Sequence, residues 1–146
     1  MPTLSSPRAR LAAVATLLVV AFGCDAGARR AERDADDRFA RTYIRTLHDS
    51  GVSAVLGRTK RESAAVPAFA LGVDAMRLLL PASLDTVQLV KADSPADSSS
   101  DTTAAGGMHL VYRVRGGGQG AEVQVWVDRE QGQPVVDQIR VARQDR

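Results

Sequence analysis

The stretch MHLVYRVRGGGQGAEVQVWVD, residues 108–128, decides the fold of this chain. Apolar and polar side chains alternate in both of its arms, and the glycine-rich segment 116–120 separates them. A period of two predicts strands over 108–115 and 121–128, and the short connection predicts that they are antiparallel. Matching the two apolar faces places Arg115 opposite Glu122 and His109 opposite Asp128.

The segments on either side of this hairpin complete the predicted domain. Residues 84–92 and 135–142 alternate in the same way and predict two further strands. Upstream, apolar spacings of three and four predict a helix ending near Asp49, a short helix over 53–63 and a third helix from Pro67. We therefore predict an α+β fold in which N-terminal helices pack on a four-stranded antiparallel sheet. The predicted core consists of Phe39, Tyr43, Leu47, Val73, Leu110, Tyr112, Val123, Val125 and Ile139.

The first 24 residues have the layout of an export signal. Arg8 and Arg10 precede an uncharged apolar run over 11–22, and Cys24 follows it as the only cysteine of the chain. As a helix this run is about 18 Å long, which is shorter than the roughly 30 Å hydrocarbon core of a bilayer. The arrangement resembles the signal and lipobox of bacterial lipoproteins. Ala26-Gly27-Ala28 also has the small-x-small form of an ordinary secretory cleavage site, so secretion without a lipid stays open as an alternative.

The lipoprotein resemblance implies a domain organisation and a location. Residues 1–23 are then a signal peptide, 24–38 a polar tether, and 39–143 a folded domain with a flexible loop over 93–107. It implies an extracytoplasmic protein held at a membrane by acyl chains such as palmitate on Cys24, in the inner or the outer membrane. An envelope protein is the expected partner of the domain.

The charge balance of the processed chain argues against nucleic acid as a partner. The whole chain has 19 Lys and Arg and 17 Asp and Glu, and residues 1–23 contain two arginines and no acid. The processed chain therefore carries 17 charges of each sign. A nucleic-acid-binding domain calls for a surplus of positive charge on one face.

The order of the elements resembles the nuclear-transport-factor-two-like superfamily of cystatin-like cone folds, which includes the SnoaL-like proteins. The resemblance covers about residues 36–143 and includes the glycine turn and strand GQPVVDQI, residues 132–139. It implies that the sheet is curved. It also implies a set of functions, because the superfamily contains isomerases, dehydratases and cyclases beside many proteins without enzymatic activity, and a fold alone does not choose among them.

Few residues offer chemistry. We expect His48 to cap the end of the first helix, and His109 to form a cross-strand ion pair with Asp128. Two distant histidines and a single cysteine predict neither a metal site nor a bound cofactor. Asp137 is the one candidate catalytic acid, because strand alternation directs it toward the core side together with Val135.

Three functions remain open from the sequence. The first, which we favour, is a lipid-anchored envelope protein with a partner-binding or accessory role, and Trp126 is a candidate contact residue. The second is a carrier that holds a small ligand inside the cone. The third is a SnoaL-like enzyme that uses Asp137 within the cone.

Overall fold

The computed structural model describes the backbone of residues 7–94 and 107–144, and their side chains from residue 26 onward. The chain divides into two compact units, Met1–Ala35 and Asp36–Arg146. Helix α1, Pro7–Ser50, supplies the described part of the first unit and continues into the second. The predicted tether, 24–38, is helical throughout, and its residues 36–38 belong to the second unit. The predicted loop falls mainly on residues 95–106, which lie outside the described residues.

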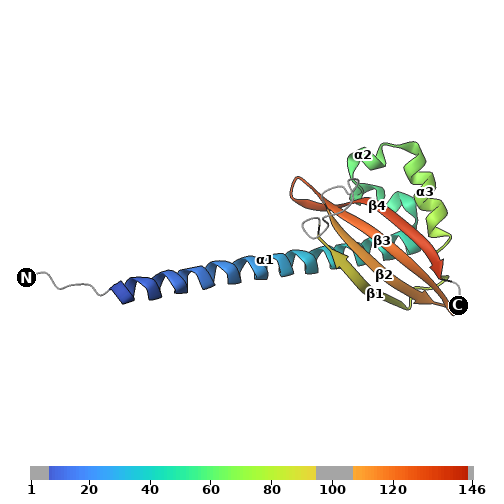
Figure 1. Ribbon diagram of the computed structural model, residues 1–146. Helices are drawn as coiled ribbons and strands as arrows, with labels where there is room; N and C mark the ends of the chain where they lie inside the picture. The colour runs from blue at the N-terminus through green and yellow to red at the C-terminus, as the bar shows by residue number, and fades with distance from the viewer. Residues whose placement is uncertain (1–6, 95–106, 145–146) are drawn as a thin grey trace, which may run out of the picture. The chain divides into compact units, whose positions relative to one another are not determined.

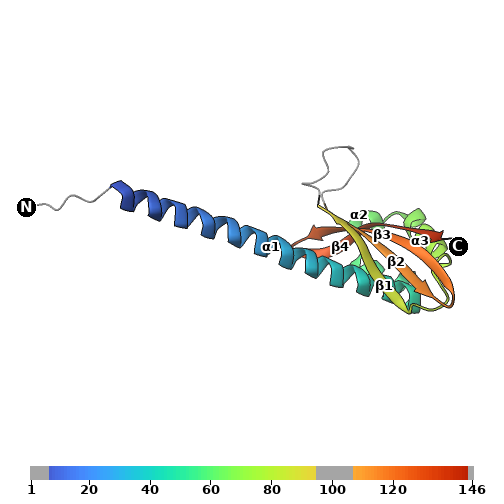
Figure 2. The same cartoon turned by 60° about the horizontal axis from the view of Figure 1, so that its bottom comes forward.

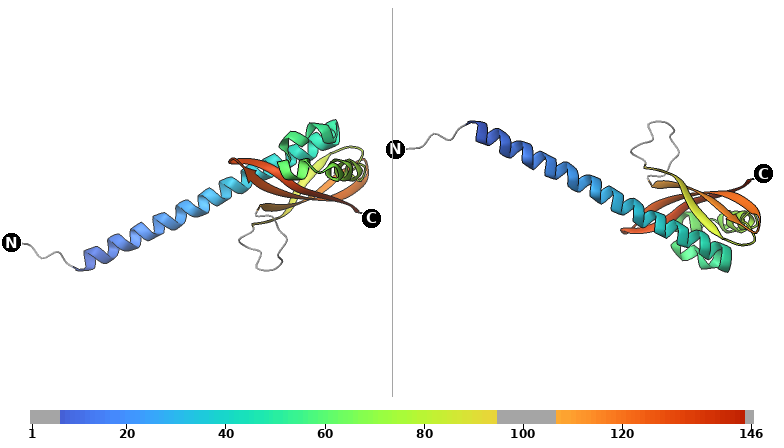
Figure 3. Two further views of the ribbon diagram at one scale, coloured as in Figure 1. Left: turned by 90° about the horizontal axis from the view of Figure 1, so that it is seen from above. Right: turned by 90° about the horizontal axis from the view of Figure 1, so that it is seen from below.

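The second unit is an α+β domain, as predicted from the sequence. The last part of α1 is followed by short helical segments and then by four antiparallel strands in the order β1-β2-β3-β4 (Figure 1). The sheet twists and curves, and the helical segments lie against one face (Figures 2 and 3). The elements are η1 Val52–Ala54, η2 Leu56–Arg58, α2 Arg61–Ala64, α3 Pro67–Arg77, β1 Thr86–Asp93, β2 Met108–Gly116, β3 Gln119–Glu130 and β4 Gln133–Gln144.

The predicted helix over 53–63 is wrong in its form. The chain makes two 3₁₀ turns, η1 and η2, and only the four residues of α2 are α-helical. Thr59 interrupts the helical course because it forms a parallel bridge with Val136 of β4. The backbone N–H of Lys60 also donates to the Val136 carbonyl at 2.8 Å. Pairing with the sheet edge thus replaces helical hydrogen bonds at this point.

The core lies between the helices and the inner face of the sheet. Leu110 and Tyr112 of β2 and Tyr43 of α1 have no exposed surface. Eight of the nine predicted core residues are buried in this cluster, and Phe39 packs against it partly buried. The inner and outer faces of β2 and β3 are therefore confirmed. Within the residues whose side chains are described, no helix is both long and apolar enough to cross a membrane.

The predicted register of the β2–β3 hairpin is wrong by two residues. Arg115 lies opposite Gly120, and Gly116 lies opposite Gln119. The turn consists of Gly117 and Gly118 alone, with φ of 55° and 78°. A two-residue turn with positive φ at both positions matches the twist of the flanking strands. A shift of two residues leaves every side chain on its predicted face, which is why the apolar pattern alone did not detect it.

The predicted orientation of Asp137 toward the core side is also wrong. The register between β3 and β4 shifts between Trp126, which pairs with Gln138, and Val127, which pairs with Val136. Asp137 is the extra residue of this β-bulge. The bulge reverses the alternation of β4, so that Val136 enters the core at 0% exposure while Asp137 does not.

Candidate functional site

The catalytic candidate Asp137 lies in a cluster of polar side chains at the bulge of β4. The Ser63 hydroxyl of α2 donates to Asp137 Oδ1 at 3.1 Å. Lys60 Nζ lies 3.8 Å from the same oxygen and 2.9 Å from Asp128 Oδ2. Beside them, the backbone N–H of Arg61 donates to Glu130 Oε1 at 3.0 Å. We call Lys60, Ser63, Asp128 and Asp137 the Lys60 cluster.

The electrostatics of the Lys60 cluster favour charged, paired groups. The hydrogen bond to Asp128 raises the pKa of the Lys60 ammonium above its ordinary value. The same bond, together with the backbone N–H of Arg129, lowers the pKa of the Asp128 carboxyl. A lysine held in its protonated form does not act as a base near neutral pH. In the structure, the Lys60 cluster links the segment before α2 to the end of the sheet through the contact of Lys60 with Asp128.

The structure gives the other candidates separate neighbours. His48 Nδ1 lies 2.6 Å from Asp49 Oδ1, and Nε2 lies 3.1 Å from the Pro81 carbonyl oxygen. This places His48 at the C-terminal end of α1, where a cation is favourable. The Tyr112 hydroxyl donates to Asp37 Oδ1 at 2.8 Å. In these contacts neither side chain joins Asp137.

His109 does not face Asp128, so the predicted ion pair is wrong. With the observed register His109 lies opposite Trp126, and the two rings stack with centroids 4.4 Å apart and planes 14° apart. The carboxylate near it is Asp93 of β1, with Oδ2 at 3.7 Å from His109 Nδ1. The two-residue shift of the hairpin is the physical reason for the change of partner.

Trp126 is the centre of a stack on the outer face of the sheet. The Arg140 guanidinium lies over its ring, 5.3 Å from the centroid. When the Gln138 amide is oriented to suit its neighbours, its oxygen accepts from Arg140 Nε and Nη2 at 3.2 Å each. Strands β2, β3 and β4 thus contribute His109, Trp126 and Arg140 to one row of stacked groups.

A pocket of about 410 Å³ adjoins this stack. Gln124 Nε2 donates to Glu122 Oε1 at 2.8 Å within it. We call it the Arg140 pocket, and its lining is Met76 of α3, Glu122 and Gln124 of β3, and Arg140, Val141 and Ala142 of β4. The sequence analysis missed it. The polar residues at the outward positions of β3 could have indicated part of this lining. The contribution of Met76 could not be predicted, because it depends on how α3 packs on β4.

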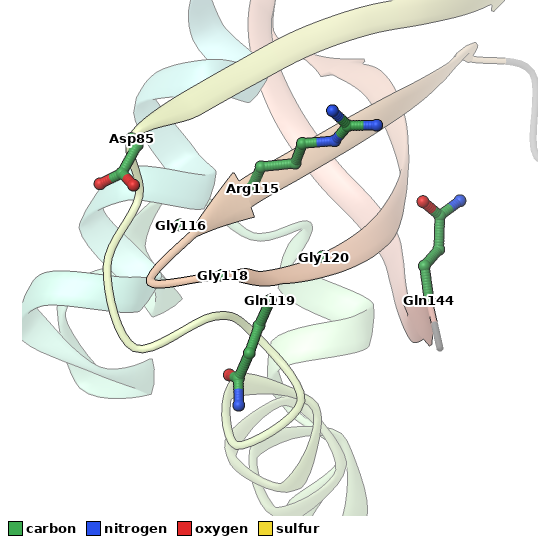
Figure 4. A pocket seen from close by; sticks show the side chains of 7 residues that line it. All are labelled: Asp85, Arg115, Gly116, Gly118, Gln119, Gly120 and Gln144. Carbon is green, nitrogen blue, oxygen red and sulfur yellow. The ribbon is translucent and has the colours of Figure 1, made fainter. Parts of the chain in front are cut away.

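A second pocket of about 400 Å³ surrounds the β2–β3 turn. Its longer side chains, Arg115, Gln119 and Gln144, point in different directions, so they do not converge on one point (Figure 4). Asp85 Oδ2 accepts a hydrogen bond of 3.3 Å from the Gly117 N–H. The pocket therefore reflects how the turn packs on the segment before β1.

Large side chains are fully buried between the helices and the inner face of the sheet. Tyr43, Tyr112 and Val123 have no exposed surface, and none of them lines the Arg140 pocket or the pocket at the β2–β3 turn. Among residues 26–94 and 107–144, no three His, Cys, Asp or Glu side chains are grouped to hold a metal ion.

The surface of α3 carries exposed apolar side chains. Leu71 of α3 and Leu78 just after the helix are each 74% exposed, and Val66 just before the helix is 50% exposed. Leu71 and Leu78 are seven residues apart, so they lie on the same side, two turns from one another. Exposed apolar side chains on one side of a helix are candidates for a contact surface.

No protein-family model, no curated protein and no solved structure matches this chain.

Proposed function

We propose that this protein is a lipid-anchored protein of the bacterial cell envelope and that its second unit binds an envelope partner. The observation that carries the anchor is the arrangement of Arg8 and Arg10, the apolar run 11–22 and the single Cys24. The next residues, up to Ala35, belong to a helix and to a unit separate from the folded domain. This is consistent with a spacer between a lipidated residue and the domain.

Partner binding at the surface is supported by the burial of the domain. Its inner face carries side chains at zero exposure, such as Leu110 and Tyr112, which supports binding at the outside of the domain. Leu71 on α3 and Leu78 directly after it offer exposed apolar side chains for a contact. We assign the partner contact to these two residues.

The anchor is tested with two matched variants expressed in a bacterial host. Cys24→Ala removes the acylated thiol, and Ala28→Leu blocks the alternative secretory site while leaving Cys24 in place. We expect Ala28→Leu to remain in the membrane fraction with an acyl label such as palmitate, and Cys24→Ala to lose the label. Label incorporation that is unaffected by Cys24→Ala would contradict the proposal.

The partner contact is tested by placing a photo-crosslinking amino acid at Leu71 or Leu78 in cells. Gln88, exposed on β1, is the control position. We expect one discrete adduct from both leucine positions and none from Gln88. The absence of an adduct at both leucines, or the same adduct at Gln88, would remove α3 as the contact surface.

A further inference from the structure

Arg140 is a cation without an acidic partner in the described part of the chain. No described carboxylate lies within the 4 Å of an ion pair from its guanidinium, although Glu122 lines the same pocket. Lys60, in contrast, is paired with Asp128 at 2.9 Å. Within the described residues, the charge of Arg140 is therefore not paired with a carboxylate.

The guanidinium of Arg140 is held in place before any ligand arrives. The Trp126 ring lies beneath it, and the Gln138 amide, in the orientation that suits its neighbours, accepts through its oxygen from Nε and Nη2. A guanidinium has further N–H donors in a planar fork that fits a carboxylate. Because the side chain is already oriented, a ligand does not have to bear the full entropy of ordering it.

The other walls of the Arg140 pocket define what else a ligand must carry. Gln124 donates its amide N–H to Glu122 Oε1, which leaves the Gln124 oxygen and the second Glu122 oxygen as acceptors. These acceptors suit an N–H donor of the ligand. Met76, Val141 and Ala142 supply the apolar part of the lining.

We propose that the Arg140 pocket binds the carboxy terminus of a peptide. The terminal carboxylate pairs with Arg140, the N–H of the last peptide bond donates to the Gln124 oxygen, and a small apolar side chain packs on Met76 and Ala142. The Glu122 carboxylate repels dense negative charge, which favours a single carboxylate over a phosphate. The choice of a peptide deepens the proposed function and rests on it, because it assumes an envelope partner.

The test uses the chain from Cys24 to Arg146 and its own fluorescence, because Trp126 is the only tryptophan. The probes are acetyl-trialanine with a free carboxylate, the same peptide with an amidated end, and inorganic phosphate. We expect a saturable change in Trp126 emission with the free acid, and binding at least tenfold weaker with the amide and with phosphate. Equal binding of the acid and the amide, tighter binding of phosphate, or no saturable change would overturn the proposal.

Two variants and a control connect the signal to the pocket. Arg140→Gln removes the charge, and Gln124→Ala removes an acceptor while keeping the Arg140–Trp126 contact. We expect each to weaken free-acid binding at least tenfold. Arg115→Gln is the control, because this exposed arginine lies on the same face of the sheet but outside the Arg140 pocket. An equal loss of free-acid binding in this variant would also overturn the proposal. Acylation of Cys24 and crosslinks at Leu71 are measured separately, so the two proposals fail independently.

Discussion

The Tyr112 hydroxyl on β2 donates a hydrogen bond of 2.8 Å to the Asp37 carboxylate on α1. Arg41 Nε lies 2.9 and 3.0 Å from the two oxygens of the same carboxylate. The preceding residue, Asp36, is only 3% exposed and pairs with Arg129 of β3. Two acids that the sequence analysis assigned to the tether thus attach α1 to the sheet. Asp36 is also the first residue of the second unit.

Alkaline pH should unfold the protein through its two tyrosines. Burial raises the pKa of both Tyr43 and Tyr112, and the Asp37 carboxylate raises that of Tyr112 further. In the unfolded chain both phenols ionise near pH 10. Because the folded state holds these protons more tightly, the free energy of unfolding should fall as pH rises above about 10. We expect tyrosinate absorbance to appear only together with loss of circular dichroism; titration of either tyrosine in the folded protein near pH 10 would contradict this.

Replacing Leu110 should destabilise the domain strongly. Its side chain is fully buried in the core, so Leu110→Ala leaves a cavity and should lower the free energy of unfolding by about 2–5 kcal/mol. Leu71→Ala is the matched control, because Leu71 is 74% exposed and its truncation should change stability by less than about 0.5 kcal/mol. Urea denaturation measures both. Similar losses for the two variants would mean that the faces are assigned incorrectly.

Gly116 is required because the backbone before β1 passes directly over it. A Cβ at this position would lie 1.8 Å from the Ser83 carbonyl oxygen. We expect Gly116→Ala to cost about 1–3 kcal/mol of stability through this overlap. Gly72→Ala on α3 meets nothing within 4 Å and should stabilise the helix by about 0.5–1 kcal/mol. Thermal unfolding of the two variants should move in opposite directions, and a stable Gly116→Ala protein would disprove the close approach.

The Lys60 cluster should make stability depend on acid pH. The pKa of Asp128 is lowered in the folded state, so its contribution is present above the unfolded value near 4 and is lost as pH falls. Lys60→Gln removes the principal cause of that shift and should reduce the loss of stability between about pH 5 and pH 3. Lys91→Gln is the control, because the Lys91 side chain, which pairs with Asp93, is largely exposed to solvent. An unchanged acid profile for Lys60→Gln would show that the pair contributes nothing.

The architecture was predictable because it depends on local patterns. Alternation in β2 and β3 determines which side chains face the helices, and Leu110 and Val125 are buried as that alternation predicts. The register depended on which glycines form the turn, and either choice keeps the same faces inward. The bulge at Asp137 depends on pairing with β3 and has no signature in β4 alone.

The candidate site was less predictable, because its contacts join distant parts of the chain. The Arg140 pocket needs Met76 from a helix and Glu122 from another strand. The Lys60 contact with Asp128 spans 68 residues. The sequence identified Trp126 as a contact candidate, but not the cation placed over its ring.

The most direct test of the account is mass spectrometry of the N-terminal peptide of the membrane-extracted protein. We expect a peptide that starts at Cys24 and carries the added mass of a lipid on that residue. An unmodified peptide that starts at Arg29, the product of cleavage after Ala26-Gly27-Ala28, would contradict lipid anchoring, as would a chain that retains residues 1–23.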